Sequence, residues 1–303
     1  MLPQKLNRTN DALFKFVFAR KENKGIPLSF VNSVFIAKGT PVIDDLEFID
    51  RELDPVEEDG KSSRLDLLGR APDDTNVEVE IQVEQLMLMG DRSLYYWARL
   101  YNSLKSGDDY DRLRRTVMIN VLDFNLFDPK AFPDFHHCFG VYDPEKNLRL
   151  TSHLEIHTLE LPKWKLEKPI GELTGLEKWM SYFSKKTTPE ELEAIAMTEP
   201  MMQEALKREI IFTQDEIQRR LYEKTEKYHR DQRAIDQYNL NRGIDIGMNL
   251  GMNRGIDIGM NQGKSDMVLR LLRARQPLDL IMQVSQFSHE KIAEIGRQNG
   301  IVV

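Results

Sequence analysis

Apolar and polar residues alternate along residues 64–83, RLDLLGRAPDDTNVEVEIQV, in the pattern of a β-hairpin. Two strand-like runs flank a turn cluster at 72–76. Residues two apart on a strand point to the same side of a sheet, so Glu80 and Gln82 share one face. Pairing of the two strands places Asp66 opposite them on that face.

Apolar residues elsewhere in the first half of the chain recur at the spacings of helices and strands. Helices are expected at 9–37, with Thr9 or Asn10 as the N-cap and a second helix at 26–36, and at 85–106. Extended segments are expected at 42–50, 115–124 and 137–161, and a charged loop at 51–63. The apolar run at 115–124 is typical of a buried strand flanked by helices. This order of elements predicts an α/β core over residues 1–165.

The predicted helix at 85–106 is amphipathic. Its apolar residues lie three or four positions apart, at Leu94, Trp97, Ala98, Tyr101 and Leu104.

The chain after residue 165 is predicted to be all helical. A helical extension is expected at 166–212, a charged helix with a glycine repeat at 213–263, and a small helical tail at 264–303. The tail has the outline of a helix-turn-helix, with Ser288 as an N-cap. We favour plain packing of its helices without DNA contact.

Glycine recurs every four residues from Gly243 to Gly263, in GIDIGMNLGMNRGIDIGMNQGK. Glycine costs about 1 kcal/mol relative to alanine inside a helix, so the repeat needs a physical reason. A spacing of four forms a slowly drifting stripe that would allow close approach of a second helix. A flexible spacer is the other interpretation. The Asp, Asn and Arg residues in the repeat exclude a membrane helix.

Composition narrows the setting of the protein. The net charge of −7 argues against indiscriminate binding of nucleic acid through bulk charge, although it leaves a local site open. Cys138 is the single cysteine, so no intrachain disulfide can form. No apolar run approaches the roughly 18 residues of a membrane span, and the first residues lack the apolar core of a signal peptide. We therefore expect a cytoplasmic protein without a membrane segment.

The polar face of the hairpin is a candidate site for a divalent metal. Mg²⁺ takes oxygen ligands, usually one or two carboxylates with water and phosphate. Asp66 and Glu80 would supply the carboxylates, and the main-chain carbonyl of Ile81 is a third candidate ligand. The metal would polarise a scissile phosphate and activate water. Gln82 would orient that water or donate to a phosphate oxygen.

The same pattern has a structural explanation. Charged residues that alternate with apolar ones usually mark the solvent face of a half-buried sheet, which would leave Glu78, Glu80 and Gln82 at the surface. If the metal site exists, strict alternation places Glu78 on the same face as a possible accessory acid.

Several segments of the chain resemble the PD-(D/E)XK nuclease family transposases, also called recombination-promoting nucleases. The residues that carry the likeness are Asn10-Asp11-Ala12-Leu13-Phe14-Lys15, Phe18, Asn32, Phe35, Asp66, Glu80-Ile81-Gln82, Arg92, Tyr96, Tyr110 and the glycine tetrads. The resemblance implies a restriction-endonuclease-like α/β core, with a central mixed sheet flanked by helices, followed by an all-helical C-terminal region. It also implies metal-dependent cleavage of DNA, in recombination, mobile elements or phage defence.

By the same resemblance, Asp66 and Glu80 would hold Mg²⁺, for which Mn²⁺ could substitute. Gln82 stands where the wider superfamily has lysine. Asp11 is either a further acid of this cluster or a charge that the helix dipole favours. Arg92 and Tyr96, one helical turn apart, either contact DNA or pack on each other at the surface.

Two functional hypotheses follow. The first is a Mg²⁺-dependent DNA endonuclease with catalytic residues Asp66, Glu80 and Gln82. The second is a non-catalytic DNA-binding or oligomerising protein built on a degraded nuclease core, an alternative that Gln82 keeps open. In both, the C-terminal helices are expected to form a homo-oligomer, most simply a dimer, and DNA is the expected partner.

Overall fold

The computed structural model describes residues 6–49, 66–84, 88–102, 104 and 107–301. They form two compact units, Met1–His229 and Arg230–Val303. The finer predicted boundaries at 165, 212 and 263 stay predictions, and the predicted loop at 51–63 lies outside the described residues. In the part of the chain that is described, no helix is both long and apolar enough to cross a membrane.

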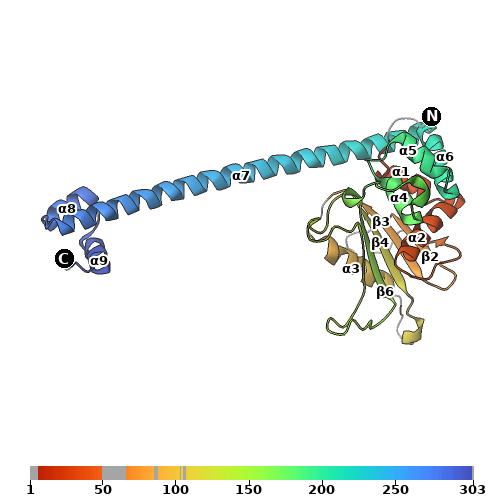
Figure 1. Cartoon of the computed structure of the whole chain (residues 1–303), viewed down its shortest axis with the longest axis horizontal. Coiled ribbons are helices and arrows are strands. Elements are labelled where there is room, and N and C mark those ends of the chain that lie inside the picture. Colours follow the sequence, from red (N-terminus) through yellow and green to blue (C-terminus); the bar gives the residue numbers. More distant parts are fainter. Residues whose placement is uncertain (1–5, 50–65, 85–87, 103, 105–106, 302–303) are drawn as a thin grey trace. The chain divides into compact units, whose positions relative to one another are not determined.

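A mixed sheet forms the centre of the first unit (Figure 1). It has six strands in the order β1-β2-β3-β4-β6-β5. The strands are β1 (Glu47–Phe48), β2 (Leu67–Arg70), β3 (Asn76–Gln82), β4 (Thr116–Leu122), β5 (His136–Phe139) and β6 (Leu154–Glu160). Strands β3, β4 and β6 are parallel, and the other pairs are antiparallel. The predicted mixed sheet flanked by helices is confirmed.

The predicted hairpin is β2 and β3. Leu67 pairs with Val79 and Arg70 with Asn76. Asp74 adopts a left-handed φ of 65° in the turn, a conformation that aspartate tolerates better than most residues. Continuing the register by one residue places Asp66 opposite Glu80, as the alternation predicted.

Helices cover both faces of the sheet. Their bounds are α1 (Asp11–Phe18), α2 (Gly25–Ala37), α3 (Met89–Tyr101), α4 (Gly175–Phe183), α5 (Pro189–Ala196) and α6 (Pro200–Gln214). Short 3₁₀ helices lie at Lys21–Asn23, Tyr110–Arg112, Leu161–Lys163 and Ile170–Glu172. The large apolar core joins α1, α2 and α4–α6 to one face of the sheet. Helix α3 packs on the opposite face (Figure 1).

Helix α1 is anchored at its N-terminus by a cap and an ion pair. The Asn10 side chain accepts a hydrogen bond of 3.0 Å from the Ala12 N–H, which confirms it as the N-cap. Arg8 donates to both carboxylate oxygens of Glu209 on α6, at 2.6 and 2.9 Å. Leu13, Phe14, Phe16, Val17 and Phe18 are buried, so the polar edge of α1 is left to Asp11 and Lys15.

The amphipathic helix expected at 85–106 is α3, and its apolar residues are only partly covered. Trp97 packs against the cluster of Met118, Leu154 and Ile156 on the sheet. Leu94 is 50% exposed, and the buried residues of the helix are Met89, Ser93 and Leu100. Ser93 can be buried because its hydroxyl donates to the Met89 carbonyl at 2.9 Å. Leu94 and Ala98 are therefore exposed, while Trp97 on the same helix contacts the sheet.

The solvent-face interpretation of β3 is also wrong. Glu78 is fully buried and Glu80 is 6% exposed. Helix α3 covers the face that carries them, and residues 77, 79 and 81 bury the other face in the core. Both faces of β3 are therefore inside the protein.

Helix α7 (Glu216–Arg273) begins in the first unit and continues into the second, where α8 (Leu278–Ser285) and α9 (His289–Gln298) follow. Val268, Ile281, Ile292 and Ile295 form a small apolar core among these three helices. Ser288 accepts a hydrogen bond from the Lys291 N–H at 3.4 Å, which confirms its predicted capping role.

The glycine repeat is helical. A Cβ atom added at any of its six glycines would meet nothing within 4 Å among the described residues. Packing within the part of the chain that the structure describes therefore does not explain the repeat.

Candidate functional site

The β2–β3 hairpin brings two carboxylates together in a buried position. Asp66 immediately precedes β2, and its Oδ2 accepts a hydrogen bond of 2.9 Å from the Ile81 N–H on β3. The side chains of Asp66 and Glu80 are only 10% and 8% exposed. The main chain of β3 therefore fixes the carboxylate of Asp66, which lies next to β2.

Burial makes this concentration of negative charge costly. Burial first, and the charge of Glu80 second, raise the pKa of Asp66 to about 8. Burial also raises the pKa of Glu80, although the neighbouring Arg92 opposes the shift. The pKa of Glu78 lies well above its ordinary value, chiefly because of burial. Three carboxyl groups in so small a volume favour either protonation or a bound cation.

The donor set fits a hard divalent cation. Glu80 Oε2 is buried and has no hydrogen-bond partner among the described residues, so one carboxylate oxygen is left for a ligand. Within the described ranges, no three His, Cys, Asp or Glu side chains form a ready-made cage for a metal. Mg²⁺ needs no such cage, because one or two carboxylates and several waters suffice.

Glu78 has the location that the alternation predicted. It lies two residues before Glu80 on the same face, and both of its carboxylate oxygens are buried without a hydrogen-bond partner among the described residues. Its part as an accessory acid stays a prediction.

Lys15 reaches the site from α1. Its Nζ lies 3.0 Å from Asp66 Oδ1 and 2.5 Å from Asp11 Oδ1, so one ammonium joins both acids. Burial lowers the pKa of Lys15, but the charges and hydrogen bonds of the two acids outweigh it and raise the pKa. The sequence pattern assigned no role to Lys15, because its contact with Asp66 links segments far apart in the chain.

Arg92 and Tyr96 on α3 form the other border of the site. An Arg92 nitrogen donates to Glu80 Oε1 at 3.1 Å, and the guanidinium lies 4.9 Å from the centre of the Tyr96 ring. The predicted packing of Arg92 on Tyr96 is thus present, together with an unpredicted contact to Glu80. Contact with DNA stays a prediction for both residues.

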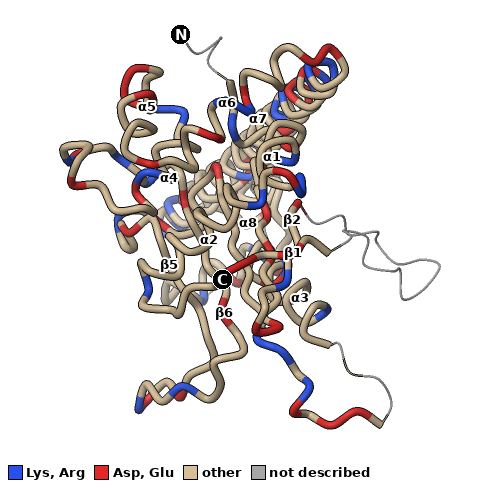
Figure 2. The backbone as a smooth tube through the Cα atoms, turned by 90° about the vertical axis from the view of Figure 1, so that its right-hand side faces the viewer, with Lys and Arg blue, Asp and Glu red and all other residues tan. Residues whose placement is uncertain are grey.

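Gln82 lies at the end of β3 and is partly exposed. Its carbonyl accepts from the Asp123 N–H at 3.0 Å, which fixes the strand end beside β4. Lysine and arginine residues are interspersed with acidic ones along the first unit (Figure 2). Positive charge at the carboxylate pair therefore comes from particular side chains, Lys15 and Arg92.

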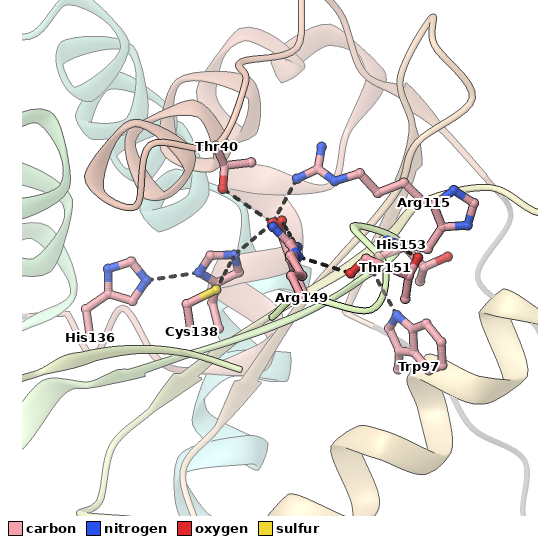
Figure 3. Close-up of polar contacts among 11 residues, drawn as sticks. Thr40, Trp97, Arg115, His136, Cys138, Arg149, Thr151 and His153 are labelled. Atoms are coloured by element: carbon pink, nitrogen blue, oxygen red, sulfur yellow. Dashed lines mark hydrogen bonds and ion pairs between the residues drawn. The ribbon is translucent and has the colours of Figure 1, made fainter. Parts of the chain in front are cut away.

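A second polar cluster lies at β5 and β6 (Figure 3). Its residues Glu155 and His157 pair with Val117 and Ile119, which face the main core, so the cluster is on the face opposite Glu80. Glu155 accepts from Arg115 at 2.8 Å and from Arg149 at 2.7 Å. His136 Nε2 lies 3.0 Å from His157 Nδ1. Burial raises the pKa of Glu155, but hydrogen bonds from His157, Arg149 and Arg115 outweigh it and hold that pKa at about 2.

This second cluster shows the features of a structural network. Its acid already has two arginine partners, and burial lowers the pKa of His136 to about 3. Burial and the charge of Glu155 raise the pKa of Cys138, so the thiol is not activated. His137 lies on the other face, with Nδ1 3.6 Å from Glu160 Oε1. The adjacent residues His136 and His137 thus point to opposite faces of the sheet, as successive residues of a strand do.

The charge at Asp66 predicts a pH-dependent stability in metal-free protein. The pKa of Asp66 is 3.8 in the unfolded chain and about 8 in the fold, so the folded state binds the proton more tightly. The resulting stability is complete below about pH 4 and is lost as the pH rises through 8. In EDTA, Asp66→Asn should exceed wild type in melting temperature by a margin that widens from pH 5 to pH 8, to roughly 5 °C. Thermal unfolding of both proteins measures it, and a margin independent of pH would contradict the assignment.

A family model described as PD-(D/E)XK nuclease family transposase matches residues 8–239. The match spans more than half of the chain and contains every residue of the site described above. Comparisons with curated proteins and with solved structures gave no match.

Proposed function

Since the chain belongs to the PD-(D/E)XK nuclease family transposases, we propose that it is a deoxyribonuclease that hydrolyses phosphodiester bonds with a divalent cation, Mg²⁺ or in its place Mn²⁺. The observation that carries the proposal is the buried Asp66–Glu80 pair. Its geometry assembles two carboxylates across a hairpin, and burial makes their joint ionisation unfavourable without a cation.

Each residue of the site has its own role in the proposed reaction. Asp66 and Glu80 would hold the cation, with the Ile81 carbonyl as a third ligand. The Ile81 N–H and Arg92 keep the two carboxylates in place. The Gln82 amide would donate to a phosphate oxygen or orient the attacking water. A bound Mg²⁺ supplies polarisation of the phosphate and a lower pKa for the water.

The bond changes are those of a hydrolysis. The water oxygen forms a bond to phosphorus while the bond from phosphorus to one sugar oxygen breaks. The water loses a proton to solvent, and the leaving sugar oxygen gains one. Arg92 and Tyr96 stand next to the carboxylates, where they would contact the DNA backbone and a base or sugar. A role in recombination, mobile elements or phage defence, in the cytoplasm, is consistent with this chemistry.

A dimer would present two such sites to the two strands of DNA. We place its interface on the second unit because the glycine repeat exposes large apolar side chains between 51% and 70%: Ile244, Ile246, Met248, Leu250, Met252, Ile256, Ile258 and Met260. Sedimentation of the intact chain beside its Leu250→Glu variant measures whether this surface self-associates.

The test of the proposed activity is cleavage of supercoiled plasmid. Purified protein should nick or linearise plasmid in Mg²⁺ or Mn²⁺, and EDTA should abolish the cleavage. Restoring Mg²⁺ after EDTA should restore it. No cleavage in either metal between pH 7 and pH 8.5, by protein that melts cooperatively, would favour the alternative: a non-catalytic DNA-binding or oligomerising protein. Gln82 is the feature that favours that alternative.

A further inference from the structure

The proposed nuclease site has a neutral residue where a cation would be useful. Negative charge grows on the phosphate oxygens during phosphodiester hydrolysis, and fixed positive groups stabilise it. Gln82 can donate a hydrogen bond, but its neutral amide has no positive charge to offset the negative charge on the phosphate. Any cationic side chain that assists the metal in stabilising this charge therefore lies at another position of the chain.

Two cations of the described residues touch the carboxylate pair. Lys15 lies 3.0 Å from Asp66, and Arg92 lies 3.1 Å from Glu80. Arg92 is held from two sides, because it donates to Glu80 and lies over the Tyr96 ring. Its contacts suit it to hold Glu80 in place.

We propose that Lys15 supplies the positive charge that faces the scissile phosphate, so that the active-site lysine has moved from strand β3 to helix α1. This inference rests on the proposed nuclease function. An ammonium on a four-carbon chain is a compact and mobile charge, whereas a guanidinium favours fixed bidentate contacts. An ammonium can therefore exchange a carboxylate for a phosphate without a fixed bidentate geometry.

The contacts of Lys15 suit this role. Its ammonium joins Asp66 to Asp11, the residue one turn earlier on α1. With a cation held by Asp66, Lys15 would leave that carboxylate, and its ion pair with Asp11 would keep the ammonium beside the site. The Lys15 side chain is 25% exposed, so a DNA phosphate can reach it. Asp11 thus acts as a positioning residue.

Helix α1 is rigid enough to place the charge. Its apolar side packs in the main core, where the rings of Phe14 and Phe18 stack at 4.7 Å between centroids. Asn10 caps its first turn. The backbone of Lys15 is therefore fixed, and only the side chain needs to move between a carboxylate and a phosphate.

The experiment compares intact wild type, Lys15→Ala, Gln82→Lys and the double variant Lys15→Ala/Gln82→Lys. Single-turnover plasmid cleavage in Mg²⁺ should fall on the order of 100-fold in Lys15→Ala. The double variant Lys15→Ala/Gln82→Lys should cleave at least about tenfold faster than Lys15→Ala, because it returns a cation to strand β3. Lys24→Ala is the matched control, because Lys24 forms an exposed ion pair with Asp45, and it should cleave as wild type does.

Two measurements without turnover separate charge from structure. The melting temperature of Lys15→Ala should stay close to that of wild type, and calorimetric Mn²⁺ affinity without DNA should stay equal or rise, because a competing cation is gone. If Lys15→Ala does not fold, Lys15→Gln carries the same expectation, since its amide can still hydrogen-bond to both acids.

Each other outcome overturns the inference. Cleavage by Lys15→Ala at the wild-type rate leaves the nuclease function standing and removes Lys15 from the mechanism. If Lys15→Ala loses both Mn²⁺ binding and cleavage, Lys15 is needed to assemble the metal site and does not act on the phosphate. Failure of Gln82→Lys to rescue a folded, metal-binding Lys15→Ala shows that charge alone is not what was lost. If wild type itself does not cleave, the proposed function fails first, and the role of Lys15 fails with it.

Discussion

Asp66→Asn is expected to lower the rate of Mg²⁺-dependent DNA cleavage at least about 1000-fold, because it removes one of two carboxylates that would hold the cation. The substitution keeps the shape of the side chain and an oxygen that can accept from the Ile81 N–H. It also removes a group whose ionisation opposes folding. The variant should therefore be inactive and folded.

Plasmid cleavage and far-UV circular dichroism, measured on the same preparation, check both halves of this expectation. Asp45→Asn is the matched control, because Asp45 is an exposed aspartate whose ion pair, with Lys24, involves neither carboxylate of the site. Full activity in Asp66→Asn would show that the carboxylates of this hairpin do not carry the reaction.

Glu209→Ala is expected to destabilise the first unit by about 3–5 kcal/mol, because it leaves a buried guanidinium without its partner. Glu209 is 1% exposed and Arg8 12% exposed, and two hydrogen bonds join them. The guanidinium also lies 5.0 Å from the centre of the Tyr182 ring. Burial, followed by the charge of Glu209, raises the pKa of Tyr182 well above its usual range, so the phenol stays neutral.

Urea unfolding measures this loss. The control is Glu204→Ala on the same helix, where a 32% exposed side chain pairs with Arg208 and should contribute no more than about 0.5 kcal/mol. In the double variant Arg8→Met/Glu209→Leu, much of the lost stability should return, because neither charge is left buried. Equal losses in Glu209→Ala and Glu204→Ala would contradict the account.

The two expectations are connected through α1. The Arg8–Glu209 pair holds the chain that leads into this helix, and α1 carries Lys15 to the carboxylate pair. Loosening the anchor should therefore weaken the site before the sheet unfolds. The cleavage rate of Glu209→Ala should accordingly fall at temperatures below its melting transition.

Local patterns in the sequence were sufficient to predict the hairpin and its register. Alternation along 76–82 and the turn residues placed Asp66 opposite Glu80 without any long-range information. Capping chemistry identified Asn10 and Ser288 in the same way. Each of these features depends on residues that are neighbours in the chain.

Features that depend on distant residues were not predictable in this way. Alternating charge on β3 is the usual mark of a solvent face, and only the packing of α3 shows that Glu78 is buried. Lys15 reaches Asp66 from a helix that precedes the hairpin by many residues. The burial of Ser93 and the exposure of Leu94 on α3 likewise depend on packing against distant residues and not on the apolar spacing of the helix.

The glycine repeat has a geometric consequence for the second unit. Its tetrads, from Gly243 to Gly263, lie within one uninterrupted helix. Each tetrad adds about 6 Å of helix and about 40° of rotation beyond a full turn. Gain or loss of one tetrad would therefore keep the helix intact while it displaces and turns the core of Val268, Ile281 and Ile292 relative to residues 230–242. The number of tetrads thus sets both the length of α7 and the rotation about its axis between residues 242 and 268, and both change in fixed steps.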